Sequence, residues 1–148
     1  MGIFDKIKNQ FDSSELKSKK SHIRNLYAIA MADGRLENSE FEFILQIGQR
    51  KLFLDGETIR SVINNIEDVS FYVPKTINER LNLLEDYVKI TIIDGNINQN
   101  EINVCKQIAI NFGFRPVVID KLFNHILNNI AHGIAKDLAL KKALDELR

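Results

Sequence analysis

The sequence predicts an all-α fold, a single domain of six to seven helices built from two pseudo-repeated helical hairpins. The main observation is an internal repeat. Residues 33–40 and 94–101 both read Asp-Gly, a polar residue, a branched aliphatic residue, three polar residues and Glu. The second observation is that apolar residues flank both copies at the same offset and with helical spacing. A repeat of this length indicates one structural unit that occurs twice.

The offset between the two copies is 61 residues, and it aligns side chains on both sides of the Asp-Gly turns. Leu36 stands opposite Ile97, and Phe53 stands opposite Phe114. We expect Leu36 to turn inward between the two helices of its hairpin.

The composition is that of a globular domain. The chain has 148 residues, of which 45% are hydrophobic and 27% are charged. Twenty basic residues balance twenty acidic residues, so no general attraction to nucleic acid is expected. The single cysteine cannot form an internal disulfide, which is compatible with a reducing, cytoplasmic compartment. No apolar run reaches the length of about 18 residues that a membrane span requires.

Residues 1–12 are predicted to form a short amphipathic helix that precedes the all-α domain of residues 13–148. Ile3, Phe4, Ile7 and Phe11 would share one face of this helix. The segment either makes weak contact with an anionic membrane surface or a partner, or packs back on the domain. We favour packing, because one short helix binds lipid only marginally.

The first half of the domain is predicted to contain helices over about 13–33, 38–51 and 55–68. Gly34 ends the first helix, because glycine tolerates the left-handed conformation after a helix. Gly48 lies in the middle of the second helix, where it should permit close helix approach. Residues 69–75 are apolar and contain a proline, so we expect a packed connection between the halves.

The second half repeats this order. The predicted helices cover about 76–94, 98–112, 116–130 and 134–147. Thr76 and Asn98, each followed three residues later by Glu, have the pattern of a capping box. Gly113 and Pro116 mark the turn before the third of these helices.

The repeated carboxylates are the candidate site. Glu40 and Glu101 fall near helix N-termini, where their charge is favourable, but Asp33 and Asp94 fall at helix C-termini, where it is not. One explanation is that each Asp binds free backbone N–H groups of the turn. The other is a Ca²⁺ or Mg²⁺ ion held by Asp33 and Glu40, by Asp94 and Glu101, or by all four. An EF-hand is excluded, because the first half of such a loop is apolar in both copies.

No pattern of residues in the sequence indicates an enzyme. His22, His125 and His132 are isolated from one another, and we interpret them as surface or packing residues. Cys105 lies on the inner stripe of its helix and is predicted to be a core residue rather than a nucleophile. Tyr87 should be buried with a partner for its hydroxyl group.

The segments Ile-Ala-Met-Ala-Asp-Gly-x-Leu-x-x-x-Glu (29–40) and Ile-Asp-Gly-x-Ile-x-x-x-Glu (93–101) resemble the bacterial TerB-like tellurite-resistance family. Its fold also occurs in the N-terminal domain of DjlA-type co-chaperones, and the resemblance covers about residues 15–130. It implies a cytoplasmic or membrane-peripheral, non-enzymatic stress-response protein with a protein partner, which could itself be membrane-associated. It also implies a metal site at Asp33, Glu40, Asp94 and Glu101.

Two features depart from the family pattern. The second copy has an Asn-rich, uncharged loop, which weakens the negative charge available to a metal. No His-Pro-Asp occurs, so the co-chaperone activity does not transfer. The alternative function is a metal-free scaffolding or regulatory interaction module in which the Asp-Gly turns are purely structural.

Overall fold

The computed structural model describes residues 13–131, so the expectations for residues 1–12, His132 and 134–147 lie outside the described part. Its helices are α2 (Ser13–Ala30), α3 (Asn38–Gln46), α4 (Gly56–Asn64), α5 (Ile77–Ile92), α6 (Gln99–Asn111) and α7 (Pro116–Ala131), with a π-helix η1 (Ile47–Lys51) and a 3-10 turn η2 (Ile66–Asp68). No β-strand occurs in residues 13–131, and the predicted all-α class is confirmed there.

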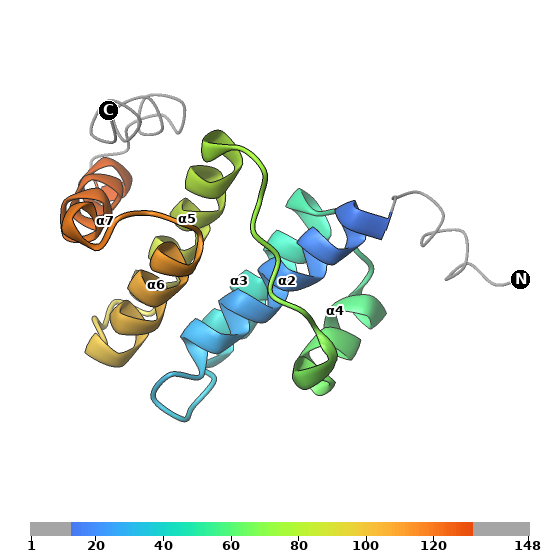
Figure 1. The fold of residues 1–148 in the computed structure, drawn as a ribbon. Helices are drawn as coiled ribbons and strands as arrows, with labels where there is room; N and C mark the ends of the chain where they lie inside the picture. The colour runs from blue at the N-terminus through green and yellow to red at the C-terminus, as the bar shows by residue number, and fades with distance from the viewer. Residues whose placement is uncertain (1–12, 132–148) are drawn as a thin grey trace, which may run out of the picture.

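Helices α2 and α5 pack against each other at the centre of the bundle (Figure 1). Helices α3 and α4 contact α2, and helices α6 and α7 contact α5, so each half supplies one central helix and two outer ones. Helix α6 also contacts α2 and thus joins the halves. The core is apolar, and Ile23, Leu26 and Leu81 within it are completely buried. No helix in the described residues is both long and apolar enough to cross a membrane.

Both hairpins turn at their Asp-Gly, as predicted, and both turns lie at the same end of the bundle (Figure 1). Gly34 and Gly95 have φ values of +87° and +82°, the left-handed conformation that glycine adopts without strain. The prediction that Leu36 turns inward is also confirmed, because it is half-buried and packs against the core. Ile97, its counterpart in the second hairpin, is 69% exposed.

The predicted helix starts are found at three positions. Asp55, Thr76 and Asn98 each accept a backbone N–H of the following helical turn through a side-chain oxygen. The first hairpin uses a capping box between Glu37 and Glu40, which was not predicted from the sequence. The connection between the halves is packed as expected, with Pro74 buried.

The helix predicted over 38–51 is not a continuous α-helix, because it changes to a π-helix at Ile47–Lys51. A π-helix accommodates one extra residue in a helical turn. The Leu54 N–H donates to the Gly48 carbonyl six residues back, at 2.8 Å. The equivalent Phe114 N–H donates to Ala109, only five residues back, at 3.2 Å.

This extra residue changes which side chain enters the core. Leu54, rather than Phe53, occupies the place of Phe114 and is 3% exposed. Phe53 takes the left-handed position that Gly113 has in the second half, with φ values of +57° and +99° respectively. The expected equivalence of Phe53 and Phe114 is therefore wrong after the π-helix, and Phe53 is 69% exposed.

The predicted role of Gly48 is confirmed. A Cβ atom placed on Gly48 would lie 2.4 Å from Cδ1 of Ile59, which is closer than real Cβ contacts. The Ile59 side chain of α4 therefore lies against the backbone of Gly48, in space that a Cβ atom would take.

Candidate functional site

The fold brings the four predicted carboxylates together at the end of the bundle where both hairpins turn. Asp33 and Asp94 lie in the turns, and Glu40 and Glu101 lie in the first turns of α3 and α6. The charges of both aspartates act on both glutamates and raise the pKa of each, after the larger effect of burial. The structure thus brings Glu40 and Glu101 into contact between the hairpins, with both aspartates near enough to act on them electrostatically.

The two glutamates form a direct contact between the hairpins. Glu40 is 1% exposed and Glu101 is 4% exposed, and their carboxyl groups hydrogen-bond to each other. Oε1 of Glu40 also accepts the Glu37 N–H at 3.0 Å, whereas its buried Oε2 meets no nitrogen or hydroxyl donor among the described residues. A hydrogen bond between two carboxyl groups requires that one of them keeps its proton.

The electrostatics of the pair follow from this arrangement. Burial raises the pKa of Glu40 above its usual range. Burial and the adjacent Glu40 carboxylate raise the pKa of Glu101 to about 8. In the absence of a cation, the pair therefore holds one proton at neutral pH.

The aspartates are exposed, and one oxygen of each is used by its turn. Oδ1 of Asp33 accepts the Arg35 N–H at 3.0 Å, and Oδ1 of Asp94 accepts the Asn96 N–H at 3.0 Å. Oδ2 of Asp33 lies 3.4 Å from Nδ2 of Asn98 in the other hairpin. The turn-stabilising explanation thus accounts for one oxygen of each aspartate.

No basic side chain among residues 13–131 forms an ion pair with either glutamate. The guanidinium of Arg35, the one basic residue in the two turns, lies 2.6 Å from Glu37. In the same described range, no three His, Cys, Asp or Glu side chains are already arranged as a metal site. A cation would find two opposed glutamate carboxyls and would draw further oxygens from the turns or from water. Oxygen ligands of this kind suit a hard ion such as Ca²⁺ or Mg²⁺.

A second polar cluster, between α2 and α5, was not predicted from the sequence. Nε2 of His22 lies 2.9 Å from Oδ2 of Asp86, and Nδ1 lies 2.8 Å from the Tyr87 hydroxyl. Nζ of Lys51 lies 2.5 Å from the same Asp86 oxygen, and Asn25 donates to Tyr87 at 3.0 Å. His22 is therefore a buried hydrogen-bonding residue, and the predicted burial of Tyr87 with a hydroxyl partner is confirmed.

The Asp86 carboxylate is stabilised in its ionised form. Burial by itself would raise its pKa, but the hydrogen bond and charge of His22, together with Lys51, outweigh burial and lower it. Lys51 is the last residue of the π-helix, so the extra residue there places an ammonium group against a buried carboxylate. Since both His22 and Asp86 are almost completely buried, the cluster serves to join α2 to α5.

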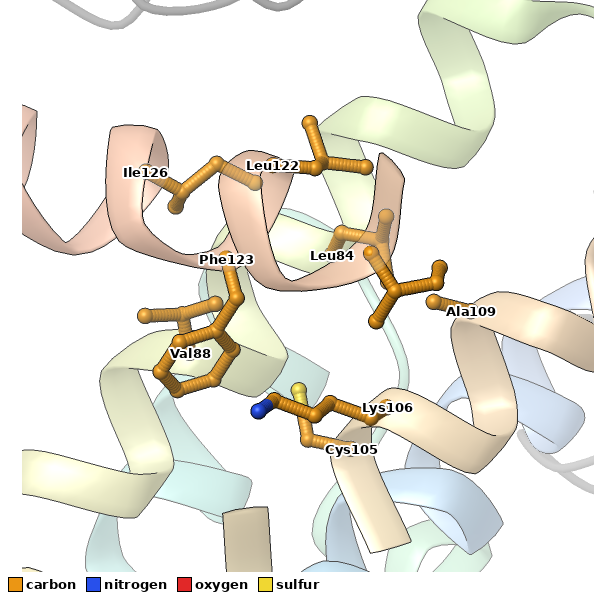
Figure 2. Close-up of a pocket in the computed structure, with 9 residues that line it drawn as sticks. Leu84, Val88, Cys105, Lys106, Ala109, Leu122, Phe123 and Ile126 are labelled. Atoms are coloured by element: carbon orange, nitrogen blue, oxygen red, sulfur yellow. The ribbon is translucent and has the colours of Figure 1, made fainter. Parts of the chain in front are cut away.

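An apolar pocket between α5, α6 and α7 lies away from the carboxylates (Figure 2). Cys105 lines it and is 2% exposed, and burial raises the pKa of its thiol to about 12, which confirms the predicted core role. Lys106 lies beside it, with Nζ 2.7 Å from Asp120 and 5.5 Å from the Phe123 ring centre. These contacts make the pocket a packing seam between helices.

No protein-family model matches the chain, and neither a curated protein nor a solved structure matches it. The TerB-like resemblance therefore rests on the residues of the two Asp-Gly segments alone.

Proposed function

We propose that this protein is a non-enzymatic, TerB-like stress-response module that binds a protein partner and takes up one divalent cation between its two hairpins. The observation that supports the cation is the buried contact between Glu40 and Glu101. Each glutamate comes from a different hairpin, and neither has a basic partner among the described residues.

Burying a carboxylate is unfavourable unless an opposite charge or several hydrogen bonds compensate for it. Most buried acids are paired with a Lys or Arg, as Asp86 is with Lys51 here. The glutamate pair has only a shared proton, and a Ca²⁺ or Mg²⁺ ion in place of that proton would neutralise both carboxylates. The ion would lie between the hairpins, so we expect one cation per chain rather than one per hairpin.

The alternative is a metal-free scaffolding or regulatory module, and one observation favours it. Asp33 and Asp94 make the same backbone hydrogen bond in their turns, so both aspartates already have a structural role. In that case the glutamate pair keeps its proton as a permanent link between the hairpins.

Isothermal titration calorimetry of the full chain with Ca²⁺ and with Mg²⁺ separates the two proposals. We expect a stoichiometry near one, and we expect Glu40→Gln and Glu101→Gln each to abolish binding. Glu67→Gln, at an exposed acid on η2, is the matched control and should bind as the parent does. Absence of binding at millimolar cation by a folded protein would support the metal-free module. A stoichiometry of two, with one site lost in each variant, would contradict a shared ion.

The location we propose is cytoplasmic, and for residues 1–12 weak contact with a membrane surface is the alternative to packing on the domain. The support is the sequence of that segment, which combines an apolar face with Lys6 and Lys8. Co-sedimentation with anionic phosphatidylserine vesicles, with and without residues 1–12, tests it. Equal partitioning of the two proteins would remove the membrane contact from the proposal.

A further inference from the structure

We infer that the turn of the second hairpin is a docking surface for a basic amphipathic segment of a partner protein. The inference deepens the proposed partner-binding function, on which it rests, and names the chemistry of the partner. It stands on two features of the turn, its exposed isoleucines and its uncompensated negative charge.

The apolar part of the surface consists of Ile93 and Ile97, which are 41% and 69% exposed. Both belong to the same turn, on either side of Asp94-Gly95. Their counterparts in the first hairpin, Ala32 and Leu36, are half-buried, and Leu36 packs against the core. The second hairpin thus carries a larger apolar side chain at position 93 and leaves both positions accessible.

The charge around these isoleucines is negative. From position 90 to position 105 the chain has no Lys or Arg, whereas it has the exposed Asp94. Asp33 of the neighbouring turn adds an exposed carboxylate, held near this turn through Asn98. Arg35, the basic residue closest in sequence to Asp33, is already paired with Glu37.

Charge complementarity decides the kind of partner. A membrane with anionic lipid would be repelled by this end of the bundle, whereas Lys or Arg side chains would be attracted to it. An amphipathic helix with a basic face would bury Ile93 and Ile97 with its apolar residues and place its cations beside Asp33 and Asp94. Because the patch is small and the charges are exposed, the interaction should be weak and sensitive to salt.

The probe is a fluorescein-labelled helical peptide of about 14 Leu and Lys residues, roughly four helical turns. The control peptide has the same sequence with Glu in place of Lys. Fluorescence anisotropy with the full chain should detect binding of the Lys peptide only, and added NaCl should weaken it. We expect the double variant Ile93→Ser/Ile97→Ser to lower the affinity about tenfold, since two buried apolar side chains are lost. The control is Val117→Ser at an equally apolar position that is 83% exposed on α7.

Three outcomes would overturn the inference: no binding of the Lys peptide, equal binding of the Glu peptide, or an equal loss of affinity in Val117→Ser. A dimer of the parent that disappears in the double variant, seen by light scattering after size exclusion, would mean that a second copy occupies the surface and would overturn it as well. Ca²⁺ calorimetry on the parent chain, run beside the peptide titration, keeps the two proposals apart. Cation binding without peptide binding would refute only this surface, and the reverse would refute only the cation.

Discussion

Raising the pH from about 5 to about 9 without divalent cations should destabilise the folded protein, and Glu101→Gln should remove most of this effect. The pKa of Glu101 is about 8 in the folded chain, above the usual 4.5. The folded state therefore keeps a proton over a pH range in which the unfolded chain has lost it. The resulting stability is complete below pH 4.5 and is lost as the pH rises through about 8.

The size of the effect follows from proton linkage. One proton of difference between the states gives a slope of about 1.4 kcal/mol per pH unit. Between the two pKa values the loss can reach roughly 5 kcal/mol, which is an upper bound because Glu40 shares the titration. In Glu101→Gln, the introduced amide would donate a hydrogen bond to Glu40 at every pH. The variant should therefore have a flatter profile and exceed the parent in stability above about pH 8.

The assay is urea unfolding followed by circular dichroism at small pH steps across that range, with a chelator present. Ionisable groups other than residue 101 contribute equally to parent and variant, so the difference between the two isolates residue 101. Glu67→Gln is the control for loss of an exposed acid and should keep the parental slope. If the parent and Glu101→Gln have the same slope, the two carboxyls do not share a buried proton and the description of the pair is wrong.

Three further substitutions test the packing, each by urea unfolding at neutral pH. Gly48→Ala should cost about 1–3 kcal/mol, because its Cβ would overlap Ile59, and an unchanged stability would mean that α4 does not pack so closely. Lys51→Met should cost about 2–3 kcal/mol and raise the pKa of Asp86, visible by NMR, because a buried carboxylate loses its charged partner. Phe53→Asn should increase stability by roughly 0.5–1 kcal/mol, since Asn tolerates positive φ better and the Phe ring is mostly exposed. A loss of stability would show that the contacts of the Phe53 ring stabilise the fold.

Much of the fold could be predicted from the sequence, because local signals determine it. The Asp-Gly turns, the caps at Asp55 and Asn98, and the core position of Cys105 each depend on a few neighbouring residues. The candidate site was partly predictable, since the repeat placed four carboxylates near two turns. Burial of the glutamates was not, because Glu in the first turn of a helix is usually an exposed capping residue.

The π-helix was not predicted from the sequence, because the alignment of the two repeat copies shows no inserted residue. The 61-residue offset still aligns Gly48 with Ala109, and the extra residue enters only afterwards. The residue type at position 53 does not predict the positive φ found there, since a large aromatic residue is uncommon at positive φ. The polar cluster was missed for another reason: His22 and Asp86 are 64 residues apart, and no local spacing links them.

That separation has a consequence for the order of folding. The contacts that join α2 to α5 close a long loop, so forming them costs more chain entropy than forming either hairpin. If the hairpins form first and the central helices dock afterwards, the cluster of His22, Asp86 and Lys51 is completed late. Substitutions in it would then leave the folding rate almost unchanged and speed unfolding. The cluster would therefore set the unfolding rate, and with it the lifetime of the native state.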